Sequence, residues 1–338
     1  MMSSSCRNGH SHRPHTLIVL GSLLGPTDVS LWQRAKTLRR RLPDRASDND
    51  VLVGNERACQ TGAGDDMTTD VEAPHEFELS FGNIEHARSR PPARFSFLRF
   101  DPNNDCNVHC VYCHNTRSKA VVDTGSFKDF LFQNVISVEN FQIGCGMEPT
   151  LDRRLGELML MIAGSPAKPT KMFILQTNGI LLHMHDYGVM REAELTGLSV
   201  SVDTVDAGTL KLLRGGTSLR KVLANVVSFH EQCPSVEMRF ITTVTALNVD
   251  RMAELVETGS DLGASHFTFR EMFYDPDNTI VDHQRMPGLM LKEGDFSRMR
   301  QALLDRFGDR MRFLFAERTW LEGENERMQA RSFGFAEP

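Results

Sequence analysis

Three cysteines lie close together between residues 106 and 113. Cys106, Cys110 and Cys113 are separated by three and then by two residues, and the aromatic Tyr112 precedes the last of them. Iron–sulfur clusters are normally held by four thiolates. Three thiolates therefore leave one iron without a protein ligand, and an open metal position is a place where a small molecule can bind and react.

The same thiolates also fit a structural zinc site. Closed tetrahedral zinc sites combine cysteine with histidine, and His109 and His114 are available as a fourth ligand. A zinc-binding or scaffold protein is therefore the second class of function. The chain has seven cysteines, and the other four are scattered: Cys6, Cys59, Cys145 and Cys233. This is not a disulfide framework, and it indicates metal binding in a reducing compartment, the cytoplasm.

Composition excludes several partners. The 338 residues are 40% hydrophobic and 24% charged, with a net charge of −6, so there is no basic surface that would favour nucleic acid. No apolar run is long enough for a membrane span. Residues 40–75 lack a strong period, and residues 1–75 are expected to be a poorly ordered or peripheral extension. An over-extended gene model, with the natural start at Met67, is the alternative. Residues 76–316 are expected to form the main domain, and residues 317–338 a tail.

Strand-like and helix-like patterns alternate through the main domain. Strands are predicted at residues 95–100, 135–143, 172–176, 198–202, 236–244 and 266–270, with amphipathic helices between them and a terminal strand at 311–315. Such repeats imply parallel strands with crossover helices. Six units are fewer than the eight of a closed barrel, so the fold class is α/β, a partial (β/α)6 TIM-type barrel. Its chemistry should gather at the carboxyl ends of the strands, where the cysteine segment lies.

Three further polar motifs follow predicted strands. Residues 144–150 (GCGMEPT) contain Glu148, whose carboxylate could accept bonds from an ammonium group or could simply begin a helix. Residues 176–179 (QTNG) contain Asn178, which could equally belong to an Asn-Gly turn. Residues 199–206 (SVSVDTVD) contain Ser201 and Asp203, and Arg214 lies one short helix later. The hydroxyl and the carboxylate could bind a polar ligand, and Arg214 could position a carboxylate or could simply lie at a solvated helix end.

Together these motifs resemble the radical S-adenosylmethionine (radical SAM) superfamily. The cysteine segment is similar to its C-x3-C-x-aromatic-C motif, and the next two motifs are similar to its GGEP and TNG elements, with Met147 where glycine is usual. The fourth resembles the SLD…D…RG segment common in the molybdopterin-precursor cyclase branch. The resemblance covers residues 94–271. It implies a [4Fe–4S] cluster on the three cysteines, SAM on its open iron, and cleavage of SAM to methionine and a 5′-deoxyadenosyl radical.

The resemblance also implies residue roles and partners. Tyr112, Glu148, Asn178, Ser201, Asp203 and Arg214 are expected around SAM. Cys145 is a candidate hydrogen-atom donor, the alternative being a small buried apolar residue. The expected activity is hydrogen abstraction from a small polar metabolite or a peptide residue, leading to rearrangement, epimerisation or dehydrogenation. Reduced flavodoxin or ferredoxin is the expected electron donor.

Two arginines on predicted strands carry a further expectation. Arg239 and Arg270 each need an anionic partner if they face inward. The carboxylate of SAM or of the substrate is one candidate, and a structural ion pair is the other.

Overall fold

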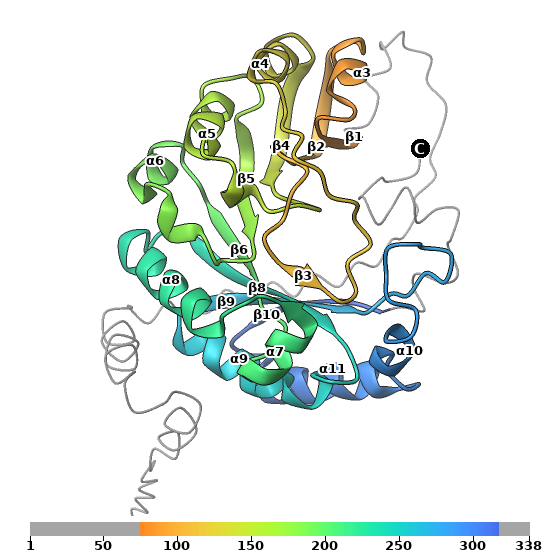
Figure 1. The fold of residues 1–338 in the computed structure, drawn as a ribbon. Helices are drawn as coiled ribbons and strands as arrows, with labels where there is room; N and C mark the ends of the chain where they lie inside the picture. Colours follow the sequence, from red (N-terminus) through yellow and green to blue (C-terminus); the bar gives the residue numbers. More distant parts are fainter. Residues whose placement is uncertain (1–74, 318–338) are drawn as a thin grey trace, which may run out of the picture.

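A computed structural model describes residues 75–317, which form one curved, open sheet with helices on its outer side (Figure 1). The predicted extension (residues 1–75) and the predicted tail (residues 317–338) lie outside the described residues, except for residues 75 and 317 themselves. The eight strands, in their order across the sheet, are β1 (His75–Leu79), β2 (Ala93–Phe100), β4 (Val135–Ile143), β5 (Pro169–Thr177), β6 (Gly197–Ser201), β8 (Glu237–Val244), β9 (Ala264–Glu271) and β10 (Arg312–Ala316). Every neighbouring pair is parallel.

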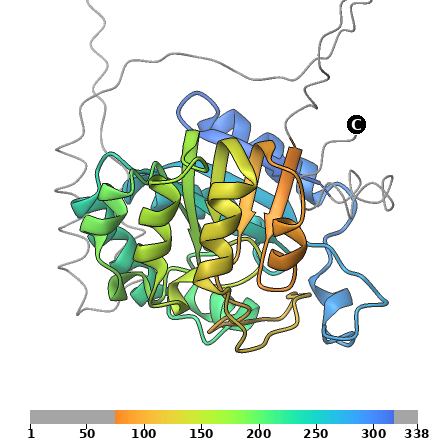
Figure 2. The same cartoon turned by 90° about the horizontal axis from the view of Figure 1, so that it is seen from above.

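The helices lie between the strands, and most of them pack against the outer face of the sheet (Figure 2). They are α3 (Ile84–Arg88), α4 (Thr124–Gln133), α5 (Leu155–Ala163), α6 (Tyr187–Glu192), α7 (Ala207–Leu213), α8 (Leu219–Gln232), α9 (Met252–Asp261), α10 (Met286–Leu289) and α11 (Asp295–Phe307). Helix α10 packs instead in a separate small cluster with Leu213 and Met272. Acidic side chains begin several of them, since Asp123 accepts a hydrogen bond from Ser126 N (2.8 Å) and Asp206 one from Thr209 N (2.7 Å). None of the described helices has the length and apolar character needed to cross a bilayer.

The predicted fold class is confirmed, with additions at the edges. The six predicted strands correspond to β2, β4, β5, β6, β8 and β9, and the predicted terminal strand is β10. The sheet gains β1, which pairs with β2 and which the pattern did not indicate. Because β1 and β10 are the two ends of the sheet and do not pair with each other, the barrel is open.

The two faces of the sheet differ in chemistry. In β8 the alternate residues from Met238 to Val244 are buried under the helices, whereas Glu237 and Arg239 between them are half-buried on the inner face. In β1 the acids Glu76 and Glu78 alternate in the same way with the buried Phe77 and Leu79. Parallel strands covered on both faces are usually continuous apolar runs. The alternation here leaves a polar inner face, which is suited to a binding site.

Gly144 ends β4 and turns the chain into the loop that carries Cys145. Its φ is +84°, and a Cβ there would lie 2.3 Å from the carbonyl oxygen of Gln176 on β5. Only glycine fits because both the left-handed backbone and the neighbouring strand exclude a side chain.

We expect Gly144→Ala to lower the free energy of unfolding by about 2–5 kcal/mol, from the left-handed backbone and the overlap together. Gly288→Ala is the matched control, since a Cβ on Gly288 would meet no atom within 4 Å and its φ is not positive, and it should cause no loss. Urea denaturation followed by circular dichroism measures both. Equal stability of the two variants would contradict this account of the turn.

Candidate active site

The cysteine loop joins β2 to α4 and crosses the inner side of the sheet (Figure 1). A two-stranded antiparallel ladder holds it: β3 (His109–Cys110) pairs with β7 (Arg214–Gly215), so that Cys110 lies opposite Arg214. Burial raises the pKa of the Cys110 thiol to about 11 and also raises the pKa of Cys106. A thiol must lose its proton to bind a metal. Binding of a metal at this loop therefore requires that these thiols lose their protons.

Asp203, which follows β6, fixes the position of the cysteine loop. It has no exposed surface, and its Oδ2 accepts hydrogen bonds from the Tyr112 hydroxyl and from Arg214 Nε (2.9 Å). Its Oδ1 accepts one from Thr243 N (3.0 Å). Asp203 does not line the cysteine cavity, and its side chain holds Tyr112 and Arg214 in place. The expectation that Asp203 contacts SAM stays a prediction.

Glu148 joins the ends of two strands. Its Oε1 accepts hydrogen bonds from the Thr150 hydroxyl (2.6 Å) and the Thr177 hydroxyl (2.6 Å), and its Oε2 accepts one from Asn178 N (2.6 Å). The residue is 2% exposed, and burial raises the pKa of its carboxyl. Oε2 keeps a lone pair free for a further donor. Glu148 thus aligns the second and third motifs and still presents an acceptor.

One cavity collects almost all of the predicted residues. It measures about 280 Å³ and is called here the cysteine cavity. Its lining includes every predicted site residue except Asp203, namely Cys106, Cys110, Cys113, Tyr112, Cys145, Glu148, Asn178, Ser201 and Arg214. Four motifs separated by up to about a hundred residues therefore meet at one place. His183 and His185, which follow β5, are absent from this lining.

The donors around the cavity suit a cluster with a polar ligand beside it. Three thiolates are one fewer than the four that normally hold an iron–sulfur cluster, so one iron would keep an open position. The unbonded hydroxyl of Ser201 and the free lone pair of Glu148 fit a polar ligand beside it.

Asp101 is a site residue that the motif patterns did not reveal. It follows β2 directly, is 5% exposed, and accepts hydrogen bonds from the backbone N–H of Cys145 (3.0 Å) and Gly146 (3.0 Å). The Cys145 thiol donates to its second oxygen (2.9 Å). Burial and the Asp101 charge raise the pKa of this thiol well above its ordinary value. The available signal was an acidic residue directly after a strand, at the reactive end of the sheet.

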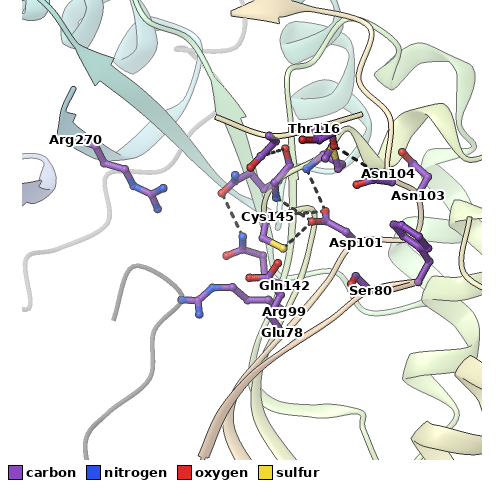
Figure 3. A pocket seen from close by; sticks show the side chains of 15 residues that line it. Glu78, Ser80, Arg99, Asp101, Asn103, Asn104, Thr116, Gln142, Cys145 and Arg270 are labelled. Carbon is purple, nitrogen blue, oxygen red and sulfur yellow. Dashed lines mark hydrogen bonds between the residues drawn. The ribbon is translucent and has the colours of Figure 1, made fainter. Parts of the chain in front are cut away.

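A second cavity of about 370 Å³ opens on the other side of Cys145 and is called here the arginine cavity (Figure 3). It shares five residues with the cysteine cavity: Asn115, Cys145, Gly146, Met147 and Gln176. Strands from both halves of the sheet contribute polar side chains to it: Glu78, Arg99, Gln142 and Arg270. Cys145 therefore lies where the two cavities meet.

We expect Asp203→Asn to destabilise the fold by about 3–5 kcal/mol, because the nearly isosteric change leaves the buried Arg214 without its counter-charge. Asp206→Asn is the control, since asparagine caps a helix as well as aspartate does and Asp206 is not part of the buried pair. Urea denaturation monitored by fluorescence and circular dichroism measures both variants. If Asp203→Asn unfolds at the midpoint of the parent, the buried network does not anchor the loop.

The comparisons with known proteins agree with this geometry. The family model described as the radical SAM superfamily matches residues 101–259. GTP 3′,8-cyclase from Cronobacter sakazakii is 28% identical over 202 residues, which are 51% of this chain and 59% of the relative. The GTP 3′,8-cyclase from a Vibrio cholerae serotype O1 strain is 31% identical over 142 residues, 39% of this chain and 41% of the relative. The chain thus matches about half of the length of these relatives.

Solved structures show the same fold at low sequence identity. Streptococcus suis SuiB bound to S-adenosylmethionine has a TM-score of 0.51 and 16% identity, over 70% of this chain and 53% of that chain. The protein anSMEcpe, with bound AdoMet and a peptide, has a TM-score of 0.51 and 20% identity, over 71% of this chain and 66% of that chain. Enzymes of this kind bind a [4Fe–4S] cluster together with SAM. With the family match and the four motifs around one cavity, residues 101–259 form a domain of the radical SAM superfamily.

Proposed function

We propose that this protein is an enzyme that cleaves SAM reductively and removes a hydrogen atom from a small polar molecule or a peptide residue. The observation that carries the proposal is the convergence of three cysteines and six further motif residues on the cysteine cavity. A [4Fe–4S] cluster with SAM on its open iron would supply an electron to SAM and release methionine and a 5′-deoxyadenosyl radical. Cys106, Cys110 and Cys113 would hold that cluster.

The other residues of the cavity offer the contacts that SAM needs. Glu148 Oε2 is an acceptor for the ammonium group, and the Ser201 hydroxyl, which has no hydrogen bond to any described residue, can bind a ribose hydroxyl. Arg214 uses its Nε on Asp203 and keeps its terminal N–H groups for a carboxylate. Asn178 is fixed by Asn107, whose side-chain oxygen accepts from its amide (2.7 Å). These roles follow from chemistry and position.

The substrate is assigned only as a peptide or a small molecule, and the electron donor only by its type. A peptide substrate is supported by the peptide-bound structures of SuiB and anSMEcpe, and a small molecule by the relation to GTP 3′,8-cyclase. Because the electron must come from outside the chain, we assign its supply to reduced flavodoxin or ferredoxin. Free thiols at all five described cysteines suit a reducing compartment, and we place the activity in the cytoplasm.

Cys110→Ala should abolish cluster binding and SAM cleavage together, because two thiolates are too few for the cluster. Cys233→Ala is the control, since Cys233 is buried at the end of α8 and absent from both cavities. Iron and sulfide content after anaerobic reconstitution, visible absorption and 5′-deoxyadenosine formation are the measurements. An intact cluster in Cys110→Ala, or stoichiometric zinc in a colourless parent protein, would contradict the proposal.

We further propose that Cys145 donates a hydrogen atom to the substrate radical. Its position between the cavities supports this role, and so does its raised pKa, because donation requires an intact S–H bond. The S–H bond breaks, a C–H bond forms on the substrate, and the resulting thiyl radical is returned to the thiol by one electron and one proton from the external reductant. The alternative is a packing role for a small residue.

Cys145→Ala should therefore keep its cluster and continue to form 5′-deoxyadenosine, whereas the product formed by hydrogen return should fall to background. Cys145→Ser, which keeps the size and the hydrogen bond to Asp101 but lacks a weak S–H bond, should behave like the alanine variant. Chromatography of nucleoside and product in one reaction measures both. An undiminished product yield would assign Cys145 to packing.

A further inference from the structure

Arg270 lies near the carboxyl end of β9 and points into the arginine cavity (Figure 3). Arg99 on β2 enters the same cavity from the opposite half of the sheet. Gln142 on β4 and Gln176 on β5 line the wall between them. The Gln176 side-chain oxygen accepts a hydrogen bond from Gln142 Nε2 (3.3 Å). Its amide N–H groups therefore remain as donors.

Arg270 and Arg239 have different electrostatic surroundings, although they occupy neighbouring strands. Arg239 forms an ion pair with Glu237 on its own strand and does not line either cavity. Arg270 has no ion pair or hydrogen bond with any residue from 75 to 317. Arg270 is exposed to solvent through the cavity. Partial desolvation by the cavity walls, and then the nearby positive charge of Arg99, lower the pKa of its guanidinium.

The other charges of the cavity do not neutralise Arg270. Arg99 lies 3.4 Å from Glu76 and stacks over the ring of Phe97 at 4.4 Å. Glu78 and Asp101 gather around the Cys145 thiol, within 4.8 Å of one another. The charge acting on Arg270 is that of Arg99, and no carboxylate lies within ion-pair distance of it in the described part of the chain. An unpaired guanidinium that faces a cavity beside a second positive charge attracts anions, so the site is suited to an anion supplied from outside.

We propose that the arginine cavity binds the substrate and that Arg270 holds an anionic group of it, a carboxylate or a phosphate, with the Gln176 amide as a second donor. The bidentate geometry of a guanidinium matches both groups. This inference rests on the proposed function, in which Cys145 reacts with the substrate. With its anionic group on Arg270, the reacting part of the substrate would lie against Cys145, at the boundary with the cysteine cavity. A substrate without an anionic group would leave Arg270 unpaired.

The test uses the full chain reconstituted with its cluster and two probes. Inorganic phosphate is followed by 31P line broadening, and succinate by saturation-transfer proton NMR. We expect the parent to bind at least one probe and Arg270→Gln to bind it at least tenfold more weakly, because a charged hydrogen-bond donor is lost. Arg239→Gln is the matched control and should bind as the parent does. The probe that responds identifies the anion as phosphate or carboxylate.

Failure of this inference can be told apart from failure of the proposed function. The same titrations are run on Cys110→Ala, which lacks the complete cysteine set but keeps Arg270. Arg270-dependent probe binding in both backgrounds supports the anion site, whatever the iron content. Absence of binding by the parent, equal binding by Arg270→Gln, or a parallel loss of SAM affinity in Arg270→Gln would overturn it.

Discussion

The buried carboxylate of Asp203 is the contact on which the site depends. It joins the end of β6 to Arg214, to Tyr112 of the cysteine loop and to the backbone of β8. Removing two charges from water costs several kcal/mol for each ion, and the cost is recovered only with good geometry and additional hydrogen bonds. Here both oxygens are satisfied. The desolvated pair therefore specifies one position for the loop, and the antiparallel pairing of β3 with β7 follows from it.

Two further carboxylates likewise hold loops in place, by accepting hydrogen bonds at the ends of other strands. Glu148 connects the loop after β4 with the loop after β5, and Asp101 holds the backbone of residues 145 and 146. All three acids lie at the carboxyl ends of parallel strands, where backbone N–H groups without strand partners are available as donors. The reactive edge is thus ordered by buried acids, while the anion-binding side of the cavity is formed by arginine.

Much of this arrangement could be predicted from the sequence. Spacing placed Cys106, Cys110 and Cys113 together, and periodicity gave the six central strands within a few residues. The five-residue β1 was missed because it is short and lies at the limit of the predicted extension, although its glutamates alternate with Phe77 and Leu79 as in a half-buried strand and bring Glu78 to the inner face. The orientation of Asp203 could not be predicted because a motif does not reveal which partners its oxygens contact. The different surroundings of Arg239 and Arg270 likewise depend on Glu237, two residues away along one strand.

The docking of the cysteine loop has a consequence for how the cofactor is acquired. Hydrogen bonds within the polypeptide already order the loop, through the Cys110–Arg214 ladder and the Asp105 carbonyl, which accepts from Glu148 N (3.0 Å). Many small metal sites spend much of their binding free energy on folding the chain around the ion. A loop that is ordered beforehand avoids this entropy cost. The protein contacts of the loop therefore reduce the share of the binding free energy that has to be spent on ordering the chain around the cofactor.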